Sequence, residues 1–221
     1  MKTGPYTIAA GCVLLWLAGS PATAGPVSGT IRTVGRSGIV PAPSIVYAEP
    51  LGVSPVRQPS RATLRQKNKT FTPRLLGIST GSVVEFPNDD IIFHNVFSLS
   101  GPKPFDLGLY RSGESRARTF TEPGTYHVFC NIHPTMAAFI VVVPTPHVSL
   151  AGSDGRFVLE LPAGRYRLTA MSERADPVSV EIVAEVGATQ APEITLDESR
   201  WTATPHKNKF GKDYPPESYK R

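Results

Sequence analysis

The chain has 221 residues and a formal net charge of +5, with 19% charged and 40% hydrophobic residues. This composition is typical of a globular protein of one or two domains. The charge surplus is modest and no dense basic stripe with interleaved aromatic residues occurs, which argues against nucleic acid as a partner.

The N-terminal segment, residues 1–24, has the pattern of an export signal peptide. Lys2 supplies a positive charge, an apolar core runs from about Ile8 to Ala18, and Ala22 and Ala24 fit a small-residue cleavage site. The apolar run is shorter than the ~20 residues of a membrane span. We therefore expect cleavage near Ala24, a periplasmic or secreted mature protein, and no stable membrane insertion.

Cysteine usage sharpens this expectation. Cleavage removes Cys12 and leaves Cys130 as the single cysteine of the mature chain. A lipoprotein box around Cys12 is disfavoured because the apolar run continues past it. An exported chain with one thiol forms no internal disulfide, so Cys130 is either a buried, inert residue or a thiol occupied by a metal.

The mature chain is predicted to be all-β, because short strand-like runs recur between Gly, Pro, Asn and Asp residues and no helical period is evident. Regular short strands of this kind indicate β-sandwiches. The expected strands are 27–33, 44–48, 83–86, 116–120, 124–130, 138–143, 156–161, 165–171 and 178–183.

The turn residues divide the mature chain unevenly. Residues 61–143 resemble a self-contained sandwich, and residues 25–60 and 144–198 resemble two halves of a second one into which the first is inserted. Tandem domains with an N-terminal β-arm are the alternative. Residues 199–221 form a basic segment that we expect to be mobile, the alternative being a docking arm for an acidic redox partner.

Within the second sandwich, two turn signals bracket a strand-like run. Asp154-Gly155 precedes residues 156–161, and Pro162-Ala163-Gly164 separates that run from residues 165–171. These signals predict that the two runs pair as a hairpin.

The most specific chemical signal is a Cys-x2-His-x2-Met motif formed by Cys130, His133 and Met136, with His94 upstream. Two imidazoles, one thiolate and a weak axial thioether are the ligands of a blue-copper electron-transfer site. Asp106 lies between the two ligand segments, but a hard carboxylate suits a different metal.

Strand periodicity suggests how the thiol is aimed. In the run 124–130 alternate residues face opposite ways, so Tyr126, Val128 and Cys130 share one face, expected to be the interior one. His127 falls on the other face, and we therefore expect it not to be a ligand.

These residues resemble a cupredoxin of the plastocyanin/amicyanin group, and the short Cys-to-Met loop is like that of amicyanin. The resemblance implies a Greek-key β-sandwich, one type 1 copper held by His94, Cys130, His133 and Met136, and a role for Asn95 in tying the two ligand loops together. The matching motifs are Phe71-x-Pro73, Gly81-x-Val83-x-x-Phe86-x-Asn88, His94-Asn95-Val96, Gly124-x-Tyr126 and Cys130-x-x-His133-x-x-Met136.

The flanks resemble the carboxypeptidase regulatory-like (transthyretin-like) family. The matching residues are Phe157-x-Leu159 and Leu161-Pro162-x-Gly164-x-Tyr166-x-Leu168, although Asp154-Gly155 lacks two residues of the family's first turn. The combination with a cupredoxin resembles exported proteins described as methylamine-utilisation-like.

Three functions are compatible with this pattern to different degrees. The favoured one is a one-electron carrier that passes electrons through the edge of His133 to an unidentified redox partner protein. The alternative is a copper-binding, copper-delivery or partner-binding module. An enzyme is disfavoured, because His127, His147 and His206 form no His-x-His pair for further coppers and no nucleophile–base group is evident.

Overall fold

The structure, a computed structural model, describes residues 25–54 and 57–215; the export signal predicted for residues 1–24 lies outside them. Every regular element in the described part is a β-strand, which confirms the all-β prediction. No helix in this part of the chain has the length and apolarity needed to cross a membrane.

In chain order, the strands are β1 (Gly25–Val34), β2 (Ser44–Pro50), β3 (Arg61–Thr63), β4 (Arg65–Lys67), β5 (Thr70–Thr72), β6 (Leu75–Ser79), β7 (Val83–Pro87), β8 (His94–Ser98), β9 (Phe105–Tyr110), β10 (Ser115–Thr119), β11 (Gly124–Phe129), β12 (Ala137–Val143), β13 (Val148–Leu150), β14 (Arg156–Leu161), β15 (Gly164–Ser172), β16 (Val178–Ala184), β17 (Thr189–Gln190) and β18 (Ile194–Asp197).

The middle of the chain forms one sandwich. A three-stranded sheet (β10-β7-β3) faces a five-stranded sheet (β6-β12-β11-β8-β9), and β4 pairs with β5 in a hairpin. Their shared core is rich in aromatic rings, among them Phe86, Phe105, Phe120 and Tyr126. Rings of this size dominate the apolar area that a small core buries.

The alternation predicted for β11 is confirmed. Tyr126 and Val128 are buried, and Cys130 follows them into the interior, whereas His127 is exposed on the opposite face of the sheet. There the His127 ring lies 4.6 Å from the ring of Phe139.

A second pair of sheets is built from strands on both sides of the middle sandwich. One sheet has the order β14-β1-β17, with β18 also pairing with β1, and the other has the order β13-β2-β15-β16. Strands β1 and β2, which precede the middle sandwich in the chain, thus pair with strands that follow it. A separate apolar core that includes Val27, Leu159 and Leu168 lies between these sheets.

The predicted hairpin of residues 156–161 and 165–171 is wrong. β14 pairs with β1, and β15 pairs with β2 and β16, so Pro162 and Ala163 carry the chain from one sheet to the other. The turn residues correctly mark a reversal. They do not reveal that the N-terminal strands are the pairing partners of both runs.

Several strands were not anticipated, and β8 shows why. All five of its residues, His94 to Ser98, are buried. A strand that is buried throughout lacks the alternation of polar and apolar residues by which half-buried strands are recognised.

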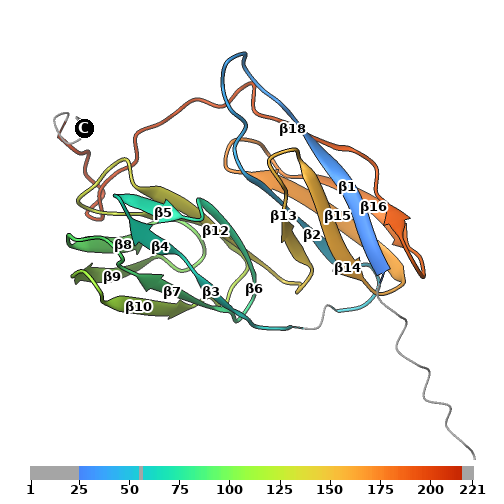
Figure 1. Cartoon of the computed structure of the whole chain (residues 1–221), viewed down its shortest axis with the longest axis horizontal. Helices are drawn as coiled ribbons and strands as arrows, with labels where there is room; N and C mark the ends of the chain where they lie inside the picture. Colours follow the sequence, from blue (N-terminus) through green and yellow to red (C-terminus); the bar gives the residue numbers. More distant parts are fainter. Residues whose placement is uncertain (1–24, 55–56, 216–221) are drawn as a thin grey trace, which may run out of the picture.

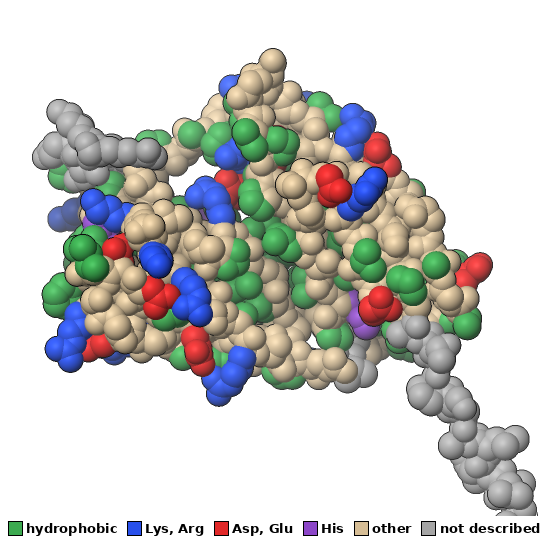
Figure 2. Space-filling model, viewed as in Figure 1, with side chains coloured by type: hydrophobic (Ala, Val, Ile, Leu, Met, Phe, Trp, Pro, Cys, Tyr) green, Lys and Arg blue, Asp and Glu red, His purple; other side chains and the backbone are tan. Residues whose placement is uncertain are grey.

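The two sandwiches lie side by side (Figure 1). They share a third apolar cluster, formed by Ile45, Leu75, Val141 and Val143 with partly buried neighbours. At Gly77 the approach is so close that an added Cβ would lie 2.7 Å from the Val148 side chain. The space-filling view shows basic and acidic side chains interspersed over the visible face (Figure 2).

Candidate metal centre

The candidate ligands meet at one end of the middle sandwich. His94 is the first residue of β8, and Cys130 directly follows β11, the strand that pairs with β8 through Phe129 and Phe97. His133 and Met136 lie in the short loop between β11 and β12. The pairing of β8 with β11 therefore brings together residues that are far apart in sequence.

The thiol and the two imidazoles converge. Cys130 Sγ lies 3.7 Å from Nδ1 of His94 and 3.6 Å from Nδ1 of His133, and the two rings are 5.0 Å apart. Within residues 25–54 and 57–215, these three residues form the one group of potential His, Cys, Asp or Glu ligands, with donor atoms all within 4.8 Å of one another.

Met136 closes the ligand loop. Its amide donates to the carbonyl of His133 at 2.9 Å, and its carbonyl accepts from the amide of Cys130 at 3.2 Å. The side chain is buried in the same apolar core as Cys130. The thioether is thus held at the buried side of the loop that carries the other two donors.

The environment of Cys130 disfavours a thiolate in the absence of a metal, but it also holds backbone amides that can stabilise one. Complete burial raises the pKa of the thiol, while backbone hydrogen bonds from Asn95, Ile132 and His133 act in the opposite direction. Without a cation the thiol stays protonated. A bound metal would replace the proton, and the three amides would then stabilise the sulfur charge.

The orientation of His94 is set by Asp90, a residue that the sequence did not single out. Asp90 Oδ2 lies 3.0 Å from Nε2 of His94 and accepts the Lys69 amide at 2.8 Å. Hydrogen bonds from the Lys69 amide and from His94 lower the pKa of Asp90 to about 2. The carboxylate occupies Nε2 and leaves Nδ1 of His94 to face the sulfur, an arrangement common to metal-binding histidines.

Sequence held one clue to this contact. Asp90 precedes His94 by four residues in an acidic turn, but only the β4–β5 hairpin shows why the turn is fixed. Asn68 and Lys69 adopt left-handed conformations, with φ of 53° and 54°, and this tight turn aims the Lys69 amide at Asp90.

His133 differs from His94 in its exposure. Partial burial and the neighbouring His94 ring lower the pKa of His133. Both causes favour the neutral imidazole, which is the form that binds metals. Its neighbour Ile132 is exposed, so the ligand loop reaches the protein surface at this point.

Asn95 bonds to Asp106 through its side chain and to Cys130 through its backbone amide. Its Nδ2 donates to Asp106 Oδ1 of β9 at 2.7 Å, whereas its Oδ1 is buried without a hydrogen-bond partner among the described residues. Its backbone amide bonds to the Cys130 thiol. Asp106 itself lies outside the ligand group and also bonds to Lys209.

A β-sandwich that presents one Cys and two His at one end defines the cupredoxin class, and comparisons with known proteins agree. No protein-family model matches the chain. Amicyanin-alpha of Methylorubrum extorquens is 37% identical over 79 residues, which are 34% of this chain and 66% of that protein. The chain thus spans just under two thirds of this relative's length.

Two solved structures are also similar. A purple cupredoxin from Nitrosopumilus maritimus is 26% identical, with a TM-score of 0.35, over 37% of this chain and 99% of that one. A copper-containing nitrite reductase from Thermus scotoductus is 32% identical, with a TM-score of 0.37, over 43% of this chain and 25% of that one.

The chain has a cupredoxin fold of the amicyanin-like kind, as the sequence motifs predicted, and the amicyanin relative and the His94, Cys130 and His133 group at one end of the sandwich support this. The resemblance of its flanks to transthyretin-like domains stays a prediction.

Proposed function

We propose that this chain is an exported blue-copper protein that carries single electrons, with one copper held by His94, Cys130, His133 and Met136. The observation that carries the proposal is the convergence of one thiol and two imidazoles within 4.8 Å at the end of a cupredoxin-like sandwich. We infer export with cleavage near Ala24, and in an oxidising compartment the lone thiol would be protected by the copper that occupies it.

The donor set fits copper. Thiolate and thioether are soft ligands, and imidazole suits copper as well, whereas no carboxylate belongs to the group. The backbone amides directed at Cys130 and the Asp90 contact of His94 prepare two of the donors for a cation. When bound, copper would supply one-electron exchange between its two oxidation states.

The protein's own residues define what surrounds that exchange. Cys130, His94 and Met136 are at most 1% exposed, so water is kept from three of the donors. His94 begins β8 and Cys130 directly follows β11. The two paired strands therefore limit movement of these donors when the charge of the copper changes. His133 lies nearer the surface beside exposed Ile132, and its edge is the proposed route for electrons to a redox partner protein.

The surrounding sandwich belongs to the proposal. We infer that residues 61–143 are inserted between strands of a discontinuous domain made of residues 25–60 and 144–198. The pairing of β1 with β14 and of β2 with β15 supports this arrangement. Insertion is tolerated where the broken ends of the host lie close together.

Absorption spectroscopy of the copper-loaded mature chain tests the proposal. We expect an intense visible thiolate-to-copper band that is lost in Cys130→Ala and kept in His127→Ala, since His127 faces away from the site. A copper-to-protein ratio near one is expected. Absence of the band would refute the blue-copper assignment, and a ratio well above one would favour a copper enzyme.

A second candidate is copper delivery or partner binding without a primary role in electron transfer. The observation that favours it is the second sandwich, which a simple carrier does not need. Fast self-exchange between oxidised and reduced protein would support the carrier. Slow electron exchange with ready transfer of copper to an acceptor would support delivery.

A further inference from the structure

The C-terminal segment from Trp201 to Tyr214, here called the strap, joins the second sandwich to the ligand loop (Figure 1). It begins beside Glu198, whose buried carboxylate accepts the Ser172 hydroxyl at 2.9 Å. The Trp201 ring then lies under the Arg174 guanidinium at 4.5 Å. One end of the strap is thus anchored on the second sandwich.

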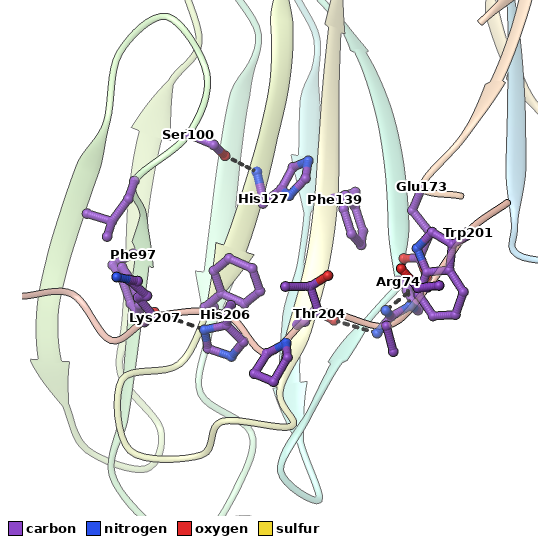
Figure 3. A pocket seen from close by; sticks show the side chains of 16 residues that line it. Arg74, Phe97, Ser100, His127, Phe139, Glu173, Trp201, Thr204, His206 and Lys207 are labelled. Carbon is purple, nitrogen blue, oxygen red and sulfur yellow. Dashed lines mark hydrogen bonds and ion pairs between the residues drawn. The ribbon is translucent and has the colours of Figure 1, made fainter. Parts of the chain in front are cut away.

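The strap next crosses the outer face of the five-stranded sheet. Figure 3 shows Trp201, Thr204 and His206 along a cavity that Phe139 also lines. The cavity has a volume of about 610 Å³, and Phe129 is among its lining residues. The His206 ring stacks on Phe129 with a centroid distance of 3.7 Å and an angle of 14°. Phe129 directly precedes Cys130, so this contact holds the strap at the edge of the site.

Beyond this point the strap bonds to the ligand loop itself. His206 Nε2 donates to the Pro134 carbonyl at 2.6 Å, and the Lys209 amide donates to Asn131 Oδ1 at 3.0 Å. The Tyr214 hydroxyl donates to the Cys130 carbonyl at 3.3 Å. Three positions of the ligand loop, Cys130, Asn131 and Pro134, are therefore held by a segment from outside the cupredoxin domain.

An ion pair completes the attachment. Lys209 Nζ lies 2.7 Å from Asp106 Oδ2, and Asp106 also accepts from Asn95, the neighbour of His94. The strap is thereby connected to both segments that carry ligands. The mobility expected for residues 199–221 stays a prediction, but the described part of this segment has specific contacts along its length.

We propose that His206, Lys209 and Tyr214 are positioning residues that hold the Cys130–Met136 loop in its ligating conformation before metal binds. Within the described loop, its own backbone contributes two hydrogen bonds, Cys130 to Met136 and Met136 to His133. Loops held by few bonds open locally, and each further bond makes opening rarer. The strap adds hydrogen bonds at Asn131 and Pro134, which the two loop bonds do not involve.

The inference deepens the proposed function and rests on it for the identity of the metal. A loop that opens rarely keeps Cys130, His133 and Met136 together, so metal leaves slowly and the donors shift little between states. A docking arm for an acidic redox partner is the alternative that the sequence left open for this basic tail. In the structure, Lys209 of the tail forms an ion pair with Asp106.

Amide hydrogen exchange on the metal-free mature chain tests the strap directly. The test variant combines His206→Ala with Tyr214→Phe. The matched control is Lys207→Ala, which removes a tail charge from an exposed side chain. We expect the amides of Cys130 and Met136 to exchange about tenfold faster in the test variant and unchanged in the control.

Two further measurements separate positioning from general stability. Copper transfer to an excess of a Cu(I) chelator should be about tenfold faster in the test variant, with an unchanged urea midpoint. His206→Gln keeps an N–H donor, so its copper transfer should be slower than that of His206→Ala. If the double variant lowers the urea midpoint, His206→Phe, which keeps a ring on Phe129 but lacks the donor, is compared in its place.

Loop exchange and copper transfer equal to those of Lys207→Ala would overturn the proposal. The exchange measurement needs no copper, so it is independent of the proposed function. Fast loop exchange in the test variant with no visible copper band in the unsubstituted chain would keep the strap and refute the blue-copper assignment. A normal visible band in the unsubstituted chain, together with unchanged loop exchange in the test variant, would support the blue-copper assignment and refute the role of the strap.

Discussion

Replacing Asp90 by Asn tests how the structure fixes the orientation of His94. Both carboxylate oxygens of Asp90 accept hydrogen bonds, Oδ2 from Lys69 and His94 and Oδ1 from the Ile91 amide. An Asn side chain has one acceptor oxygen and one NH₂ group. Whichever way it is turned, an NH₂ group faces at least one N–H donor, so at least one contact is lost.

The magnitude follows from the charge of the carboxylate. Its hydrogen bonds lower the pKa of Asp90 from 3.8 to about 2. At about 1.36 kcal/mol per pH unit this is about 2.4 kcal/mol, which solvent screening reduces to about 1–2 kcal/mol. Because the folded-state pKa is the lower one, this stabilisation is complete above about pH 4 and is lost as the pH falls through about 2.

Urea unfolding of the metal-free chain measures this effect. At pH 7, Asp90→Asn should lower the free energy of unfolding by about 1–2 kcal/mol, and the difference from the unsubstituted chain should shrink between pH 4 and pH 2. In the copper-loaded chain, metal affinity should fall about 10- to 100-fold.

Asp89→Asn is the matched control. Asp89 forms a 2.6 Å ion pair with Arg65 in which both side chains are more than a third exposed, and such pairs contribute about 0–1 kcal/mol. Equal losses of stability and of metal affinity in the two variants would show that Asp90 does not orient His94, and would refute the reasoning.

Three further predictions concern the framework. Gly77→Ala should lower the free energy of unfolding by about 1–3 kcal/mol, because its Cβ would lie 2.7 Å from Val148. Adding Val148→Ala to this variant should recover most of the lost stability in urea unfolding. Additive effects of the two substitutions would contradict the close packing of the two sandwiches at this point. Lys69→Gly should raise the free energy of unfolding by about 0.5–1 kcal/mol, since Gly adopts a φ of 54° without strain; a lower thermal midpoint would contradict this. Glu198→Ala leaves the Ser172 hydroxyl without its acceptor and should cost about 1–3 kcal/mol, whereas a loss below about 0.5 kcal/mol, the level of an ordinary surface substitution, would show that the contact is unimportant.

Sequence reasoning was reliable where a local pattern reflects a local cause. The alternation of β11 predicted correctly that Tyr126 and Val128 face the core and His127 does not, because successive side chains of a strand point to opposite faces. It was unreliable for β8, which is buried on both faces. It was wrong about the pairing of β14 with β15, because partners supplied by a distant part of the chain leave no local trace.

The sequence by itself predicted the candidate donors: one thiol, two imidazoles and a thioether whose types and spacing indicate copper. It also predicted nine of the eighteen strands in the described residues, because period-two patterning and turn residues are local features of the sequence. Only the tertiary structure decided what surrounds the donors. The Lys69 amide that holds Asp90 against His94 comes from the β4–β5 hairpin, and the Tyr214 hydroxyl at the Cys130 carbonyl comes from a segment 84 residues further along the chain. Neither contact leaves a spacing pattern in the sequence, because its partners meet only in the folded chain.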